Sequence, residues 1–268
     1  MIRNPHPSSA LDAVQQRLGL ALSALLLAGA AVAAPGLPST NVAWVPAASD
    51  ADVDRAFAQA REQRKPVLLY WGATWCPPCN QLKATLFNRQ DFAAQAKSFV
   101  AVHVDGDRPA AQKLGTRFKV RGYPTVILMN AEGAEISRLP GAADAPQVMA
   151  ILQAGLAGGR PLRSVLADAR AGKALSANEW RLLAFHGWEV DEDQLVPAAQ
   201  RPLVLAELAR RGAAGGADAE TTTRLWLKAL AASDDGKGVQ PDAPLRDLVQ
   251  RVTGEAPLAR THMDVLTG

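Results

Sequence analysis

The chain has 268 residues, of which 48% are hydrophobic and 21% charged. This is the composition of an ordinary soluble globular protein with room for one or two domains. The formal net charge is only +3, and no dense run of Lys and Arg is interleaved with aromatic residues, which argues against nucleic acid as a partner.

The first 34 residues have the pattern of a signal peptide. Arg3 and Arg17 precede an almost uninterrupted run of Leu, Ala, Gly and Val at 18–34, which ends in small residues before Pro35. Such an ending is typical of a cleavage site. The run has about 17 residues, which is close to the minimum length of a helix that spans a bilayer. We therefore predict export with cleavage, and the alternative is a retained membrane anchor.

A linker and the first elements of a folded domain are expected next. Residues 35–48 are predicted to be a linker because prolines recur in it. Ser49 is a candidate N-cap for a helix that runs to about residue 63 and ends before Lys65-Pro66. The short, continuous apolar run 67–71 then predicts a strand that is buried on both faces.

Helices and strands alternate along the rest of the first half of the chain. We expect helices at 81–87, 90–96, 109–115 and 144–157, and strands at 99–104, 126–129 and 134–139. This order predicts an α/β domain over residues 49–157, with a mixed central sheet and helices on both of its faces.

A second, helical domain is predicted at 161–268. The sequence Gly158-Gly159-Arg160-Pro161 breaks the preceding pattern, and no convincing strand follows it. Short amphipathic stretches follow instead, at 162–171, 176–185, 201–211, 219–231 and 244–252.

The only two cysteines, Cys76 and Cys79, lie two residues apart between the first predicted strand and a helix. A disulfide that closes so short a loop constrains little of the unfolded chain, which favours a catalytic pair over a structural one. At the helix N-terminus the macrodipole favours the thiolate of Cys76, the expected exposed and attacking sulfur. Cys79, one turn further in, would resolve the mixed disulfide. We expect no cofactor besides this redox-active disulfide, and no metal.

Two motifs carry a resemblance to a known family. Trp75-Cys76-Pro77-Pro78-Cys79 after a buried strand, and Gly122-Tyr123-Pro124-Thr125 before a hairpin, resemble the thioredoxin superfamily. Residues 65–139 are most similar to periplasmic thioredoxin-like proteins, including the C-terminal domain of the membrane reductase DsbD. The resemblance covers about residues 44–157. It implies a thioredoxin fold, a periplasmic location, protein substrates with disulfides or thiols, and a membrane electron donor of the DsbD type.

The resemblance also implies roles for residues around the cysteines. Pro124 would be cis and face the pair, and the backbone of Tyr123 would pair with substrate. Trp75 would lie beside the sulfurs and limit the access of water, or else be a core aromatic residue. Tyr70 occupies the position of a buried carboxylate in relatives, and it cannot act as a base near neutral pH. His103 is expected to be a core histidine with satisfied hydrogen bonds.

The direction of exchange stays open at this point. Pro77 and Pro78 lack amide donors that could stabilise a thiolate, which favours a less acidic Cys76 and a reductase. The alternatives are an oxidase or isomerase, and a non-enzymatic module that handles copper or assists assembly. The physiological substrate, the oligomeric state and the role of residues 161–268 are not predicted.

Overall fold

A computed structural model describes residues 42–139, 144–191, 194–233 and 238–267, and all of them fall within one compact unit. The predicted signal peptide, residues 1–34, and the first part of the predicted linker, 35–41, lie outside these residues. Among the helices of the described residues, none has the length and apolar character needed to cross a membrane.

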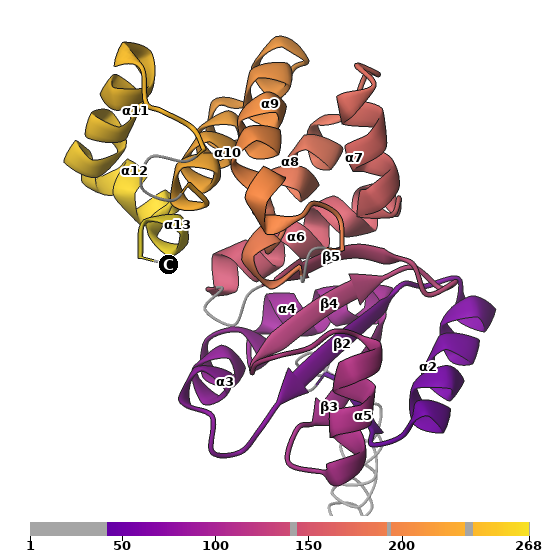
Figure 1. Ribbon diagram of the computed structural model, residues 1–268. Coiled ribbons are helices and arrows are strands. Elements are labelled where there is room, and N and C mark those ends of the chain that lie inside the picture. The colour runs from indigo at the N-terminus through magenta and orange to yellow at the C-terminus, as the bar shows by residue number, and fades with distance from the viewer. Residues whose placement is uncertain (1–41, 140–143, 192–193, 234–237, 268) are drawn as a thin grey trace, which may run out of the picture. The chain divides into compact units, whose positions relative to one another are not determined.

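The core of the unit is a mixed sheet of five strands in the order β1-β3-β2-β4-β5 (Figure 1). The strands are β1 Val45–Ala47, β2 Val67–Gly72, β3 Val100–Asp105, β4 Thr125–Met129 and β5 Glu135–Leu139. β3 is parallel to β1 and β2, and β4 is antiparallel to β2 and β5. The predicted α/β fold class is confirmed.

β1 lies inside the predicted linker, so that part of the linker prediction is wrong. The strand has only three residues, with Pro46 in the middle, and therefore shows too little alternation to be recognised in the sequence. Proline is tolerated there because β1 is an edge strand that pairs only with β3.

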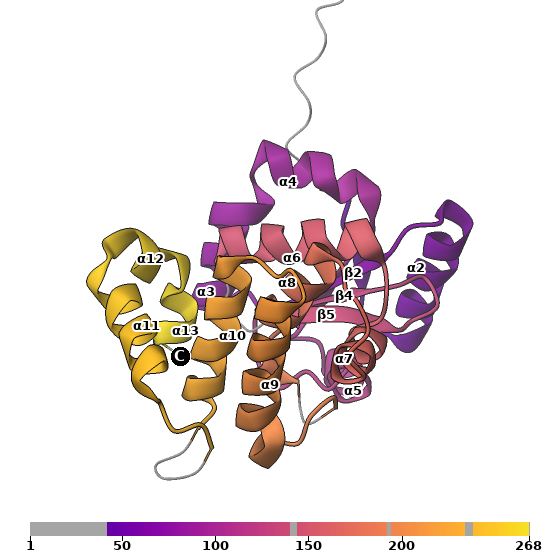
Figure 2. The ribbon, with the colours of Figure 1, turned by 90° about the horizontal axis from the view of Figure 1, so that it is seen from above.

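Helices cover both faces of the sheet, and all six residues of β2 are consequently buried. Successive side chains of a strand point to opposite faces. Val67, Leu69 and Trp71 share one hydrophobic cluster with α2 (Asp50–Gln63) and α5 (Pro109–Arg117). Leu68 and Tyr70 share the other with α3 (Pro77–Leu82), α4 (Gln90–Gln95) and α6 (Ala145–Gly158). Figure 2 shows α4 and α6 on one side of the sheet and α5 on the other.

Most helices begin where their capping residues predict. Ser49 forms a capping box with Asp52 at the start of α2, and Asp144 forms another with Gln147 at the start of α6. The helix after the cysteines is less regular than predicted. It leaves α-helical geometry after Leu82 and continues as a π-helical segment, Lys83–Phe87.

The C-terminal part is all-helical, as predicted. Its helices are α7 Leu162–Arg170, α8 Ala177–Phe185, α9 Arg201–Ala214, α10 Ala219–Ala231, α11 Ala243–Gly254, α12 Ala256–Thr261 and α13 Met263–Thr267. α7 and α8 contact β5, and α8 packs along α6 (Figure 1). Buried side chains of α7 to α10 belong to the same hydrophobic cluster as Leu68 and Tyr70. The boundary predicted at 158–161 thus falls between α6 and α7 within one continuous core.

A buried arginine on β5 connects the two parts. Arg138 is only 2% exposed, and its guanidinium donates to both carboxylate oxygens of Glu135, at 2.8 and 2.7 Å. The remaining donors reach three backbone carbonyls, those of Phe118, Lys119 and Val190. The first two carbonyls follow α5, and the third lies in the helical part. Arg138 therefore donates hydrogen bonds to backbone carbonyls on both sides of the predicted domain boundary.

The helical part also pairs with the backbone of β5, the last strand of the sheet. The carbonyl of Arg138 accepts a hydrogen bond from the N–H of Gly187 at 2.8 Å. The N–H of Arg138 donates to Nδ1 of His186 at 3.3 Å. An edge strand is a potential site of aggregation, and these contacts cover it.

We predict that Arg138→Met lowers the free energy of unfolding by about 3–5 kcal/mol, because it leaves a carboxylate and three carbonyls without their buried donor. Urea denaturation followed by circular dichroism measures this change. The matched control is Arg260→Met on the exposed face of α12, for which we expect a change below about 0.5 kcal/mol. Equal effects of the two substitutions would contradict the role assigned to Arg138.

Candidate active site

The two cysteines lie where β2 leaves the sheet. The chain turns after Gly72, and Cys76 is the N-cap of α3. Cys76 and Cys79 form a disulfide, with their Cα atoms 5.2 Å apart. The backbone N–H of Cys79 donates to Sγ of Cys76 at 3.2 Å. The pair therefore sits at a helix N-terminus, as the sequence predicts, with one amide aimed at the outer sulfur.

The cysteines are more buried than the sequence indicates. Cys76 is 2% exposed and Cys79 is fully buried, so the prediction of an exposed Cys76 is wrong for this disulfide form. Both cysteines belong to a small apolar cluster with Ala73, and the partly buried Tyr123 packs against it. Tyr123 is therefore the side chain that contributes to the cover of the pair.

Tyr123 reaches this cluster because Gly106 leaves room for its ring. A Cβ atom at position 106 would lie 2.4 Å from Cζ of Tyr123, which is shorter than a van der Waals contact, so any residue other than glycine would displace the ring. The Tyr123 hydroxyl donates to the Gly106 carbonyl at 3.3 Å. The pKa of this hydroxyl is raised, mainly by burial and to a smaller extent by the negative charges of Asp107 and Asp105. The N–H of Gly106 donates to the carbonyl of Gly72, so the turn after β3 is tied to the end of β2.

Pro124 lies beside the end of β2 as well. The Tyr123–Pro124 peptide bond is cis, the isomer that the resemblance implies, and Pro124 is buried. The next residue, Thr125, pairs with Trp71 near the end of β2. The antiparallel pairing of β2 and β4 thus brings two motifs together that are far apart in the sequence.

Trp75 is an exposed residue, not a core aromatic. It is 69% exposed, and its Nε1 donates to Oδ1 of Asp107 at 2.5 Å. The other oxygen of Asp107 accepts from the N–H and hydroxyl of Thr74, at 3.4 and 3.3 Å. Asp107 therefore anchors the segment that precedes Cys76. The sequence does not indicate this role, because Asp105-Gly106-Asp107 shows only a turn signal.

Pro77 and Pro78 occupy the first turn of α3 and are exposed, at positions whose amide groups the helix does not need. The first amide of α3 available to the sulfur of Cys76 is consequently that of Cys79. This is the loss of donors that the sequence predicts for the Cys-Pro-Pro-Cys segment.

Two polar groups beneath α3 have no hydrogen-bond partner among the described residues: the hydroxyl of Tyr70 and Nε2 of His103. The two rings are stacked, with centroids 5.1 Å apart. Burial raises the pKa of Tyr70 to about 12, so it is no base near neutral pH. Burial, reinforced by Lys83, lowers the pKa of His103. The expectation of a histidine with satisfied hydrogen bonds is therefore wrong at Nε2.

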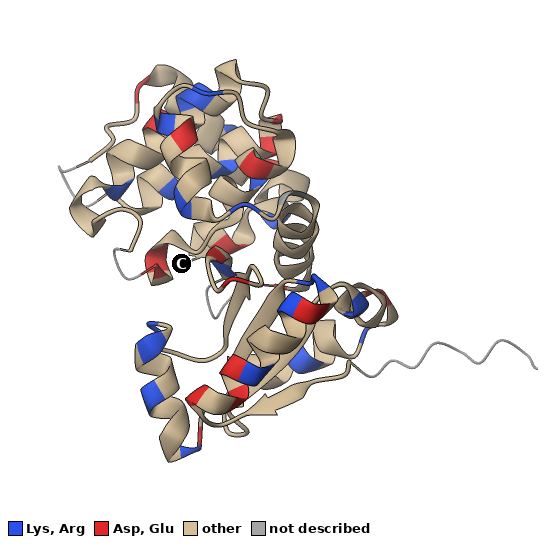
Figure 3. Ribbon diagram, turned by 90° about the vertical axis from the view of Figure 1, so that its right-hand side faces the viewer, with Lys and Arg blue, Asp and Glu red and all other residues tan. Residues whose placement is uncertain are grey.

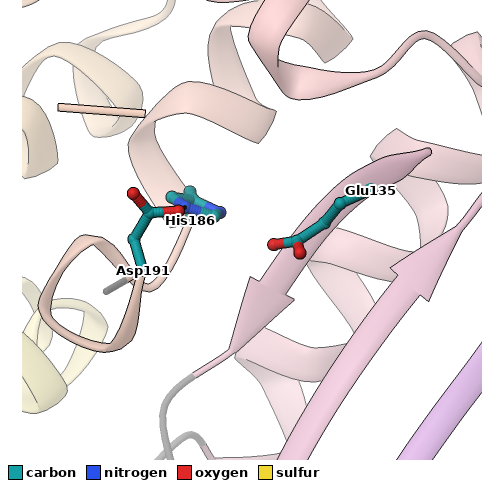
Figure 4. A group of neighbouring side chains, drawn as sticks. All are labelled: Glu135, His186 and Asp191. Atoms are coloured by element: carbon teal, nitrogen blue, oxygen red, sulfur yellow. Dashed lines mark hydrogen bonds and ion pairs between the residues drawn. The ribbon is translucent and has the colours of Figure 1, made fainter. Parts of the chain in front are cut away.

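The described residues contain one group of three potential metal-ligating side chains, and it lies away from the cysteines (Figure 4). Glu135 extends from β5 toward His186 and Asp191, with potential ligand atoms within 4.8 Å of one another. These atoms already have partners. Both Glu135 oxygens accept from Arg138, and Nε2 of His186 lies 3.3 Å from Asp191 Oδ1. The guanidinium would also repel a cation, so we interpret the group as a structural network.

Charged residues of both signs are interspersed over the helices. Figure 3 shows Lys and Arg close to Asp and Glu along the described helices, in line with the small net charge. Nothing in this distribution favours a nucleic acid, and the absence of such a partner stays a prediction.

Comparison with known proteins identifies the class of the sheet-containing part. Residues 53–156 match the thioredoxin-like domain family. Solved structures with a similar chain include a thioredoxin from Thermus thermophilus, at 26% identity over 41% of this chain and 83% of that one, with a TM-score of 0.36. The family match confirms the predicted resemblance of this part of the chain to the thioredoxin superfamily.

Among curated proteins, the matching segment is similar to proteins named thiol:disulfide interchange protein DsbD. The DsbD of Klebsiella pneumoniae is 33% identical over 117 residues, which are 42% of this chain and 19% of the relative. A disulfide bond reductase DsbH of Chlamydia pneumoniae is 24% identical over 99 residues, which are 31% of this chain and 57% of the relative. The chain thus spans about a fifth of its DsbD relatives, and the predicted similarity to DsbD is confirmed for one domain.

We predict that Tyr123→Ala accelerates the reduction of the Cys76–Cys79 disulfide by dithiothreitol roughly threefold or more, because exchange rates depend on access to the attacked sulfur. Quantification of free thiols in acid-quenched samples measures the rate. Tyr70→Phe is the matched control, since it changes a buried tyrosine that lies in another cluster. If both variants are reduced at the wild-type rate, Tyr123 does not cover the disulfide.

Proposed function

We propose that this protein is a thiol-disulfide oxidoreductase that acts on protein substrates through Cys76 and Cys79. The observation that carries the proposal is the disulfide between two cysteines at the start of α3, with Tyr123, the residue before the cis Pro124, packed against it. The matched domain contains both cysteines, and relatives of this domain are named for thiol:disulfide interchange. These names support the chemistry without assigning it to this chain.

The exchange begins from the reduced pair. The thiolate of Cys76 attacks one sulfur of a substrate disulfide, and the other substrate sulfur leaves as a thiolate. The thiolate of Cys79 then attacks the Cys76 sulfur of the mixed disulfide. This step releases the second substrate thiolate and restores the Cys76–Cys79 bond. Two electrons pass from the protein to the substrate, and the released thiolates take up protons from solvent.

The geometry favours Cys76 as the attacking residue. Its sulfur lies at the N-terminus of α3 and accepts the N–H of Cys79 in the oxidised form. A positive helix end and an amide donor both stabilise a negative charge on sulfur. Cys79 lies inside the helix and is fully buried, which suits a resolving residue that needs no contact with bulk solvent.

Substrate access requires a movement of side chains around Cys76. Tyr123 packs against the cysteine cluster, and the indole of Trp75 lies on the surface with its ring centroid 6.4 Å from that of Tyr123. We propose that an extended substrate segment pairs with the backbone of Tyr123, displaces its ring and packs on Trp75. Because the pKa of Tyr70 is about 12, the proton of Cys79 is transferred to water or to a substrate thiolate.

We further propose that the protein is exported to the periplasm, works as a reductase and receives electrons from a membrane donor of the DsbD type. The relative named disulfide bond reductase DsbH supports this direction, as do the two exposed prolines between the cysteines. A reductase in that compartment needs an external donor, because the periplasm is kept oxidising.

The enzymatic proposal predicts that the wild-type protein accelerates the precipitation of insulin chains in dithiothreitol, whereas Cys76→Ser leaves the rate at that of dithiothreitol alone. The loss is expected because the one remaining cysteine, Cys79, is fully buried and does not reach the disulfides of insulin. Turbidity at constant protein concentration measures it, and Thr253→Ser on the exposed face of α11, far from the pair, serves as the control. Identical curves for wild type and Cys76→Ser would rule out the enzyme.

The reduction potential of the Cys76–Cys79 couple decides the direction. Equilibration with glutathione buffers should yield a value below about −200 mV for a reductase, and a value above about −150 mV would indicate an oxidase or isomerase. Stoichiometric Cu(I) binding by the reduced protein, with no turnover of insulin, would favour the copper-handling alternative instead.

A further inference from the structure

The helical part contains a cavity with a buried amine. The cavity has a volume of about 290 Å³ and lies between α9, α10 and α13. Apolar side chains form most of its wall, among them Trp188, Leu205 and Val265. Lys228 on α10 lines the same cavity and is 8% exposed. Lysine is rarely buried to this extent, so its position beside a cavity indicates a binding role.

One contact fixes the orientation of the amine. Nζ of Lys228 donates to the backbone carbonyl of His186 at 2.8 Å. Oε2 of Glu189 lies 3.7 Å from the same nitrogen, at the exposed rim. A neutral lysine has two N–H groups and one lone pair, so this carbonyl can hold one N–H while the lone pair stays available for bonding. The structure thus combines an amine nucleophile, a neighbouring carboxylate and an apolar space.

The charges around the cavity are nearly balanced. Two cationic residues, Arg201 and Lys228, and two acidic ones, Glu189 and Asp264, line it, and Asp264 forms an ion pair with Arg224. Burial lowers the pKa of Lys228 to about 8; Glu189 opposes this shift, and Arg224 reinforces it. Around neutral pH the neutral amine is therefore far more abundant than on an ordinary lysine, whose pKa is about 10.4.

We propose that this cavity binds a small apolar aldehyde, which Lys228 holds as an imine. The balanced charges offer little to a ligand with a charge of its own, whereas Trp188, Leu205 and Val265 suit an apolar body of about one ring. A carbonyl carbon is the electrophile that a desolvated lysine amine captures. The site is separate from the cysteine pair and independent of the proposed redox function.

The capture is reversible and involves no oxidation. The lone pair of Lys228 Nζ attacks the carbonyl carbon, and the C=O electron pair moves to oxygen. A proton passes from nitrogen to that oxygen, with the Glu189 carboxylate as the carrier. The hydroxyl then takes up the second N–H proton and leaves as water, while an electron pair of the nitrogen forms the C=N bond. One aldehyde and one amine become one imine and one water, and hydrolysis reverses the process.

Reductive trapping tests the proposal. The full-length protein is incubated with benzaldehyde and cyanoborohydride at neutral pH, and peptide mass spectrometry locates the benzyl group. We expect Lys228 to be labelled at least about tenfold faster than exposed Lys173, because its lower pKa yields more neutral amine. The initial rate at Lys228 should saturate with aldehyde concentration, as binding before reaction requires.

Matched variants separate the cavity from general reactivity. Lys228→Arg should lose this label and keep the others, and Glu189→Gln should slow labelling of Lys228 while Lys173 is unaffected. Urea-unfolded protein should show no preference for Lys228. Labelling of Lys228 no faster than Lys173, or a rate that rises linearly with benzaldehyde and never saturates, overturns the proposal.

Discussion

The burial of β2 on both faces is the constraint on which the site depends. All six residues of this strand are enclosed by helices, so the chain can reach solvent again only beyond Gly72. There it turns into α3, and the turn places Cys76 at the N-cap. The same burial aligns β4 against β2, which brings Pro124 and Tyr123 to the same end of the sheet. The cysteine pair is therefore held by the hydrophobic core, and its chemistry follows from the position at a helix start.

The helical part extends this core. Arg138 and the backbone contacts of β5 with His186 and Gly187 cover what would otherwise be an open sheet edge. The cost of burying a guanidinium is offset by Glu135 and three carbonyls, which accept from all five of its N–H groups. In this arrangement the sheet, α6 and the helices α7 to α10 share one hydrophobic cluster. The helical part also contains the apolar cavity beside Lys228, which is lined only by residues C-terminal to the sheet.

Much of the fold could be predicted because local signals and tertiary packing agree. The caps Ser49 and Asp144 begin helices where expected, and the apolar run 67–71 is the central strand. The cysteine pair was evident from its spacing. Other features depend on contacts between distant segments and leave no local pattern: the cover of Cys76 by Tyr123, which requires Gly106, and the anchoring of Trp75 by Asp107. The edge strand at Pro46 was missed because it is short, and Arg138 resembles any polar residue of an alternating strand.

The central claim is that Cys76 forms the covalent link to substrate and Cys79 releases it. Incubation of the Cys79→Ser and Cys76→Ser variants with an oxidised protein substrate, followed by non-reducing electrophoresis, tests this claim most directly. The account predicts a persistent, dithiothreitol-sensitive complex for Cys79→Ser, because the resolving sulfur is absent, and none for Cys76→Ser. A complex that accumulates with Cys76→Ser, or equally with both variants, would contradict the assignment of the two sulfurs.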